Sequence, residues 1–252
     1  MKKHPHGFNL ASLNLTIRSL FTGYLLVIGI GLAVAGGQIL LTHGMADGKF
    51  GLSIDDIVYS YYGDRESSKL ENKLHGSMQD KAPRVVRQAI IKWVREGADE
   101  QQWQESIQEK FAQNCIKCHG VIPGLPDFNT LAGVLPVAHI DQGASISSLT
   151  RVSHIHLFGI AFIFFFVGLI FSLTVGINSW LKTLMITMPF AFLMIDVMSW
   201  WLTKIHPSFA WLTIIAGVGY TIASAYMWIT SIIQMWWYPY KGKYSNENPW
   251  FN

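Results

Sequence analysis

Cysteine and charge are both scarce in this chain of 252 residues, and each scarcity excludes a class of protein. The two cysteines, Cys115 and Cys118, provide neither a disulfide framework nor a four-cysteine metal site. Charged residues make up 14% of the chain, and the formal net charge is +3. Fourteen of the sixteen acidic residues lie between Asp47 and Asp141, where basic residues accompany them. This balanced charge is typical of a solvated surface and gives no sign of nucleic-acid binding.

Apolar residues are abundant instead, and four apolar runs are long enough to span a membrane. A helix needs about 20 such residues to cross the hydrocarbon layer. The predicted spans are 20–42, 156–177, 184–202 and 209–236. The first span contains Ala33-Val34-Ala35, which resembles a signal-peptide cleavage site, but its apolar run continues to Leu41. We therefore interpret it as an uncleaved signal anchor and predict a mainly α-helical protein with a four-helix membrane bundle.

Basic residues near the span ends predict the orientation, because cytoplasmic loops are enriched in lysine and arginine. These residues are Lys2, Lys3, Arg18, Lys182, Lys241 and Lys243. The loop between the third and fourth spans has the single basic residue Lys204. The sequence therefore predicts a multi-pass protein of the bacterial inner membrane, with cytoplasmic tails at 1–19 and 238–252. A periplasmic domain would cover 43–153, between the first span and spans two to four at 154–237.

Aromatic residues near the predicted span ends agree with this arrangement, since tryptophan and tyrosine favour the membrane interface. They are Trp200, Trp201, Trp211, Trp236, Trp237 and Tyr238. Several glycines within the spans predict close helix contacts. They are Gly159, Gly168, Gly176, Gly217 and Gly219.

The most specific motif is Cys115-Ile116-Lys117-Cys118-His119, a C-x-x-C-H sequence. In such a motif the two thiols add across the vinyl groups of one haem, and the adjacent imidazole is the proximal iron ligand. A redox C-x-x-C would need a thioredoxin-like βαβ context, and a zinc site would need further ligands. The sequence therefore predicts one covalent haem c, held by Cys115, Cys118 and His119.

Two amphipathic segments precede this motif. Asp99 is a predicted N-cap, and the apolar residues Trp103, Ile107 and Phe111 follow it at four-residue spacing up to Cys115. An earlier segment has a second apolar face, and Gly97 is its predicted end. That face consists of Val86, Ile90, Trp93 and Val94. The two segments predict two small helices packed around the haem.

The residues around the motif resemble class I cytochromes c. Residues 111–120, FAQNCIKCHG, are similar to the haem helix of that family, and residues 75–98 resemble its methionine-bearing loop and following helix. In that family the loop and helix usually follow the motif, whereas here they precede it. The resemblance implies that Met78 is the sixth iron ligand, because no methionine lies between His119 and Met185. His139 and His75 are the alternatives.

Four further histidines lie at span ends on the predicted periplasmic side, namely His43, His154, His156 and His206. As a group they predict one of three sites: a b-type haem, a quinol site or a metal site such as copper. For a b haem, His43 would pair with either His154 or His156, because the latter two point about 200° apart on a helix. As single residues they are typical of the membrane interface. Asp196, an acid inside a span, predicts a proton or quinol site, or a buried acid bonded to Ser199 or a neighbouring helix.

Together these features predict a membrane-bound c-type cytochrome subunit of a respiratory or other electron-transfer complex. Its partners would be the membrane, other subunits, and a quinol or a soluble cytochrome. No catalytic residue is identified, so catalysis is not assigned to this chain alone. The alternatives are a haem-based membrane sensor or assembly factor, and a self-contained quinol dehydrogenase with an additional b haem.

Overall fold

The computed structural model describes residues 8–42, 51–243 and 246–250, and these form helices and loops without a strand. Contacts divide the chain into two units. Residues 1–41 and 146–252 form the first, here called the bundle unit, and residues 42–145 form the second, here called the inserted unit.

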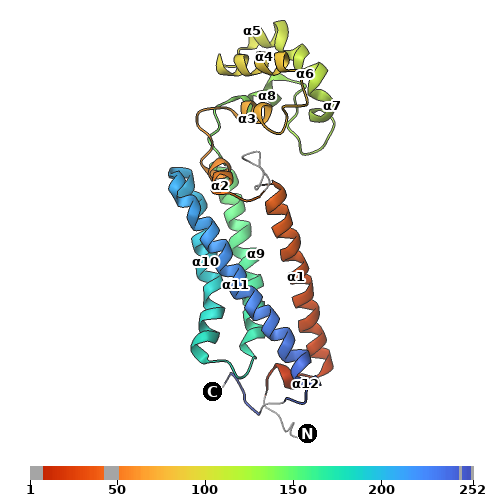
Figure 1. Cartoon of the computed structure of the whole chain (residues 1–252), viewed down its shortest axis with the longest axis vertical. Coiled ribbons are helices and arrows are strands. Elements are labelled where there is room, and N and C mark those ends of the chain that lie inside the picture. The colour runs from red at the N-terminus through yellow and green to blue at the C-terminus, as the bar shows by residue number, and fades with distance from the viewer. Residues whose placement is uncertain (1–7, 43–50, 244–245, 251–252) are drawn as a thin grey trace. The chain divides into compact units, whose positions relative to one another are not determined.

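The bundle unit contains four long helices (Figure 1). They are α1 (Leu15–Thr42), α9 (Ile146–Ser172), α10 (Ser179–Ile205) and α11 (Ala210–Ile232), which continues through a π-helical turn, η4 (Ile233–Trp237), into α12 (Tyr238–Tyr240). Two short 3-10 turns, η1 (Leu10–Ser12) and η3 (Pro207–Phe209), precede α1 and α11. Each long helix is long and apolar enough to cross a membrane. The prediction of a mainly helical protein with four helices of membrane-spanning length is therefore confirmed.

The second span differs from its predicted bounds of 156–177, because α9 begins ten residues earlier and ends at Ser172. Gly176 adopts a φ of +70° in the following loop, a conformation that favours glycine. Lys182 stabilises the end of α9, since its Nζ donates to the carbonyl oxygen of Thr174 at 2.6 Å. Gly176 is therefore a turn residue and not the helix-contact residue that the sequence suggested.

Close packing holds α9, α10 and α11 together, and α1 joins them through fewer contacts. A Cβ at Gly219 of α11 would lie 2.5 Å from the ring of Phe192 of α10, so this glycine permits the close approach that the sequence predicted. The indole of Trp228 donates to the carbonyl oxygen of Leu25 at 2.7 Å and ties α11 to α1.

Gln234 connects η4 to the loop after α9. Its Oε1 accepts from the amide of Val175 at 2.9 Å, and its Nε2 donates to the carbonyl oxygen of the same residue at 2.8 Å. Both residues are buried. The side-chain amide of Gln234 thus provides hydrogen-bond partners for the backbone N–H and carbonyl groups of Val175, which have none within a helix.

The inserted unit consists of short helices. They are α2 (Ile54–Tyr61), α3 (Lys69–His75), α4 (Arg84–Arg95), α5 (Glu100–Gln102), the π-helical turn η2 (Trp103–Ile107), α6 (Gln108–Asn114), α7 (Ile116–His119) and α8 (Leu131–Ala138). Backbone hydrogen bonds join its two ends: Asp141 accepts from Arg65 at 3.0 Å and donates to Ser67 at 2.9 Å. The backbone near the start of the inserted unit, at 65–67, therefore lies beside the backbone near its end, at Asp141.

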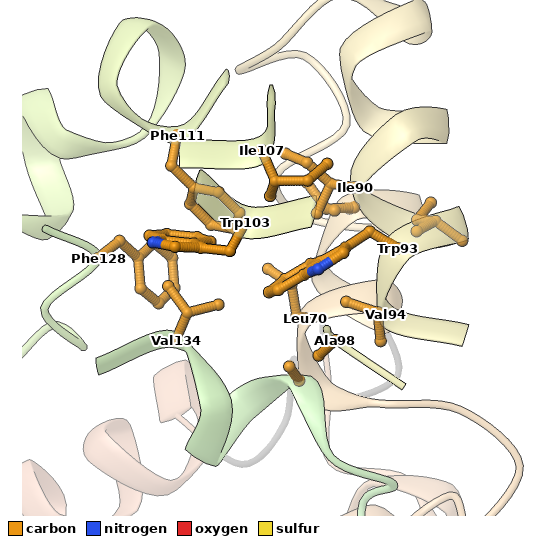
Figure 2. Close-up of a cluster of buried hydrophobic side chains, with 13 residues drawn as sticks. Leu70, Ile90, Trp93, Val94, Ala98, Trp103, Ile107, Phe111, Phe128 and Val134 are labelled. Carbon is orange, nitrogen blue, oxygen red and sulfur yellow. The ribbon is translucent and has the colours of Figure 1, made fainter. Parts of the chain in front are cut away.

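Aromatic rings dominate the core of the inserted unit. Trp103 lies 5.6 Å from Trp93 and 5.2 Å from Phe111, measured between ring centroids. Figure 2 shows these rings beside Phe128, which comes from the loop after α7. The predicted N-cap is present, because the side chain of Asp99 accepts from the amide of Gln102. The two predicted amphipathic segments thus pack against each other.

Candidate functional site

The C-x-x-C-H motif lies where α6 ends and α7 begins. Cys115 is half-buried and packs against the aromatic core, whereas Cys118 is exposed. Burial raises the pKa of the Cys115 thiol to about 11. Cys115 is the N-cap residue of α7, and the helical turn carries Cys118 and His119, so the three side chains lie within one short segment.

His119 is held by the loop that follows it. Its Nδ1 lies 3.2 Å from the carbonyl oxygen of Pro126. Because a carbonyl oxygen can only accept, Nδ1 carries the proton and Nε2 keeps its lone pair. This is the arrangement of histidines that bind metals in proteins, in which the second ring nitrogen donates to a carbonyl or carboxylate oxygen.

Phe128 fixes the plane of the same imidazole. Its ring stacks on His119 with the centroids 4.2 Å apart and the planes 10° apart. Phe128 also contacts Phe111 of the core edge-on at 5.4 Å. Neither Pro126 nor Phe128 belongs to a recognisable motif, and the signal that the sequence offers is that both follow His119 by fewer than ten residues.

The loop between His119 and Phe128 exposes apolar side chains beside the two cysteines. Val121 is 73% exposed, and Ile122 and Leu125 are exposed as well. Such a cluster of exposed aliphatic residues marks a contact site for another molecule. Two thiols, an imidazole with a free Nε2 and a neighbouring apolar surface together fit a covalently attached porphyrin.

The three candidates for the sixth ligand occupy different environments. Met78 is half-buried and packs against the same core as Cys115, in a turn where its amide donates to the carbonyl oxygen of Lys73. His75, at the end of α3, is exposed and lies 3.8 Å from the buried carboxylate of Glu71. His139 is exposed at the end of α8. Of the three, Met78 packs against the same core as Cys115.

The bundle histidines have separate local partners. His156 contacts Trp200 edge-on at 5.0 Å, whereas His154 is exposed and contacts Phe158 of its own helix. His206 accepts from the amide of Ser208 in the turn between α10 and α11. His43 lies outside the described residues. Among the residues described, no group of three or more His, Cys, Asp or Glu side chains has the geometry to hold a metal ion.

Asp196 is buried in α10 and bonded to a tryptophan. The indole Nε1 of Trp200 donates to its Oδ1 at 3.2 Å. Ser199, the residue suggested as a side-chain partner, bonds to the backbone carbonyl of Asp196 and to Thr213 of α11. Trp200 is buried, and its predicted place near the membrane interface stays a prediction. Its indole N–H is used by the carboxyl group of Asp196.

Comparison with known proteins gives one match. Residues 104–242 match the Aq_1264_TM family, which is described as a transmembrane helical domain. The matched region covers more than half of the chain and includes the C-x-x-C-H motif, α9, α10 and α11. No curated protein and no solved structure matches the chain. The chain therefore belongs to the Aq_1264_TM family of transmembrane helical domains.

Proposed function

We propose that the chain is a membrane-bound c-type cytochrome subunit that carries electrons within a respiratory or other membrane electron-transfer complex. The observation that carries this proposal is the position of His119, whose Nδ1 donates to Pro126 and whose Nε2 is available for iron beside two cysteines. When bound, haem c supplies an iron that accepts and releases single electrons.

The residues of the inserted unit have distinct roles in this proposal. The thiols of Cys115 and Cys118 form thioether bonds by adding across two vinyl groups, so each S–H hydrogen is retained in the product and nothing leaves. His119 is the proximal ligand and Phe128 maintains its ring plane. Met78 is the sixth ligand, and a thioether there raises the potential. The exposed apolar residues Val121, Ile122 and Leu125 would contact the bound haem and shield it from water.

The bundle unit provides membrane attachment. We place the inserted unit on the periplasmic side of the bacterial inner membrane and both tails in the cytoplasm, because the basic residues near the span ends favour that orientation. The proposed partners are other subunits of the complex together with a quinol or a soluble cytochrome. A bundle of four spans exceeds what tethering requires, which favours contacts with such partners.

A pyridine haemochrome spectrum of the purified full-length chain tests this proposal. The wild-type protein should show the band of haem joined by two thioethers. Cys115→Ala and Cys118→Ala should each shift that band to the position for one thioether, and the double variant should lose covalent haem. Lys117→Ala, at an exposed position between the two cysteines, is the matched control and should keep the wild-type band. A wild-type chain without covalent haem would contradict the proposal.

A further inference from the structure

Charge in the inserted unit is separated between two neighbouring stretches of the chain. The helix α4 contains four basic residues and no acidic one, namely Arg84, Arg87, Lys92 and Arg95. The segment 99–109, which covers α5, η2 and the start of α6, contains four acidic residues and no basic one, namely Asp99, Glu100, Glu105 and Glu109. Two helical segments of one small unit thus carry equal and opposite formal charge.

Three of the basic residues lie together on the solvent side of α4. Arg84, Lys92 and Arg95 are exposed, and they are here called the basic face. Because a helix turns by about 100° per residue, the three side chains point within an arc of about 80°. The other side of α4 carries the buried residues Ile90 and Trp93. The basic face is therefore directed away from the core of the unit.

A hollow of about 470 Å³ borders the basic face, and both Lys92 and Arg95 line it. Arg95 is fixed in position, because its guanidinium donates to the buried carboxylate of Glu71 through Nε at 2.9 Å and through Nη2. Its side chain is still 67% exposed. Lys92 lies 3.7 Å from Glu96 in an exposed pair on one helix, and such pairs contribute little. Both cations are thus available to acidic groups that enter the hollow.

The acidic residues of η2 and α6 have neutral partners. Glu105 accepts from the side chain of Gln101 at 2.8 Å, and Glu109 accepts from that of Gln113 at 2.9 Å. Both glutamates are exposed, and they are here called the acidic face. Within the described ranges no basic side chain lies at ion-pair distance from either of them. The acidic face therefore presents uncompensated negative charge to solvent.

We propose that the basic face of one copy docks on the acidic face of a second copy of this chain. Complementary charges steer two surfaces together and fix their register, whereas like charges oppose the other pairings. The basic face and the segment from Gln101 to Gln113 each cover about three helical turns, so their lengths match. A partner of one charge would occupy only one of the two faces, whereas a second copy supplies the counterpart of both.

The membrane favours such a contact. The long apolar helices confine the copies to one bilayer, which raises the effective concentration of one face near the other. The contact uses none of the residues proposed to hold haem. It therefore goes beyond the proposed electron-transfer function and does not depend on it.

Zero-length cross-linking of the full-length chain in liposomes tests the contact. Unlabelled and heavy-nitrogen-labelled chains are reconstituted together in equal amounts, and a carbodiimide joins lysine amines to carboxylates. Mass spectrometry should find peptides of mixed isotope in which Lys92 is joined to Glu105 or Glu109. The pair of Lys92 and Glu96 should give links within single copies and serves as the internal control.

Reversing the charges of each face tests complementarity. Energy transfer between donor-tagged and acceptor-tagged copies measures their association. The variant Arg84→Glu/Lys92→Glu and the variant Glu105→Lys/Glu109→Lys should each associate about tenfold or more weakly than the wild type, because like charges then face each other. The chain that carries all four substitutions should regain association, since its two faces are exchanged.

A matched control separates this contact from a general effect of net charge. Asp55→Lys/Glu66→Lys reverses two exposed acids outside both faces and should associate as wild type. Mixed-isotope links that avoid both faces, equal association of the wild type and both reversed variants, or no recovery in the four-substitution chain would overturn the proposal. If a reversed chain fails to fold, a salt series on the wild type decides, because association should fall between about 0.05 M and about 0.5 M salt. Association that does not change with salt would then overturn it.

Discussion

The imidazole Nδ1 of His119 lies 3.2 Å from the carbonyl oxygen of Pro126. This contact defines the tautomer of the ring, because the carbonyl oxygen requires a donor and only Nδ1–H can provide it. The six residues between the two include the exposed apolar residues Val121, Ile122 and Leu125. One short segment therefore orients the imidazole and exposes apolar side chains next to it, and a carbonyl oxygen bonded to one ring nitrogen is typical of histidines that bind metals through the other.

Removing the ring that stacks on His119 should destabilise the inserted unit. Phe128→Ala deletes a buried ring that contacts both His119 and Phe111, and a large-to-small change of this kind costs about 3–5 kcal/mol. Hydrogen exchange of the full-length chain should show faster exchange over 100–138. Val85→Ala, at a position that is 77% exposed, is the control and should change stability by less than about 0.5 kcal/mol. Unchanged exchange in Phe128→Ala would show that this contact does not stabilise the site.

Replacing Met78 should change the redox potential of the haem protein. A thioether ligand raises the potential, so Met78→Ala should lower it, on the order of 0.1 V within the roughly 0.8 V range that axial ligands span. Potentiometric titration with optical detection gives both the potential and the spectrum. His75→Gln and His139→Gln are the controls and should leave both unchanged. A normal potential in Met78→Ala together with a shifted one in either histidine variant would assign the ligand to that histidine.

The two thiols should react at different rates in the chain without haem. The thiolate is the nucleophile, and burial raises the pKa of Cys115 to about 11 from its ordinary 9.0, so its thiolate is scarce near pH 8. Cys118 is exposed and should be alkylated first by iodoacetamide, as read by mass spectrometry. The difference should narrow as the pH rises toward 11. Equal rates at pH 8 would contradict the buried environment of Cys115.

The raised pKa of Cys115 also makes the free energy of unfolding depend on pH. The folded-state pKa of Cys115 lies above the ordinary value, so the unfolded chain releases this proton at lower pH than the folded chain does. The stabilising contribution is therefore complete below about pH 9 and is lost as the pH rises toward 11. Denaturant unfolding of the haem-free chain between pH 8 and 11 should show this decline, and Cys115→Ala should lack it.

Features written in a single local stretch of sequence were predictable. The four spans follow from long apolar runs, and the arrangement of Cys115, Cys118 and His119 follows from one pentapeptide. The end of α9 was misplaced because apolar Leu173 and Val175 continue the hydropathy signal into a loop, where they are buried. The contact between the indole of Trp200 and the carboxyl group of Asp196 could not be predicted, because it depends on side-chain direction, which hydropathy does not contain.

Labelling from outside the cell should determine the orientation of the bundle. The described residues include four helices long and apolar enough to cross a membrane, and four crossings would place both tails on one side. In intact cells a membrane-impermeant maleimide should label Val85→Cys in the inserted unit, which is 77% exposed, and should not label Trp180→Cys at the start of α10, which is 84% exposed. Trp180→Cys should become labelled after permeabilisation, which controls for its reactivity. The reverse pattern would place the inserted unit in the cytoplasm, where covalent haem attachment does not occur.

Gln234 should be among the most sensitive positions of the bundle unit. Gln234→Met keeps a side chain of similar length but leaves the amide and the carbonyl group of Val175 without their partners. Each unpaired buried group costs about 1–3 kcal/mol, so we expect a loss of about 2–4 kcal/mol. Thermal unfolding in detergent should show a lower midpoint for Gln234→Met than for the wild type, whereas the control Thr187→Val, which removes an exposed hydroxyl group of α10 that bonds within its own helix, should unfold at the wild-type temperature. Equal midpoints would mean that water or lipid satisfies Val175 and that the loop after α9 does not depend on Gln234.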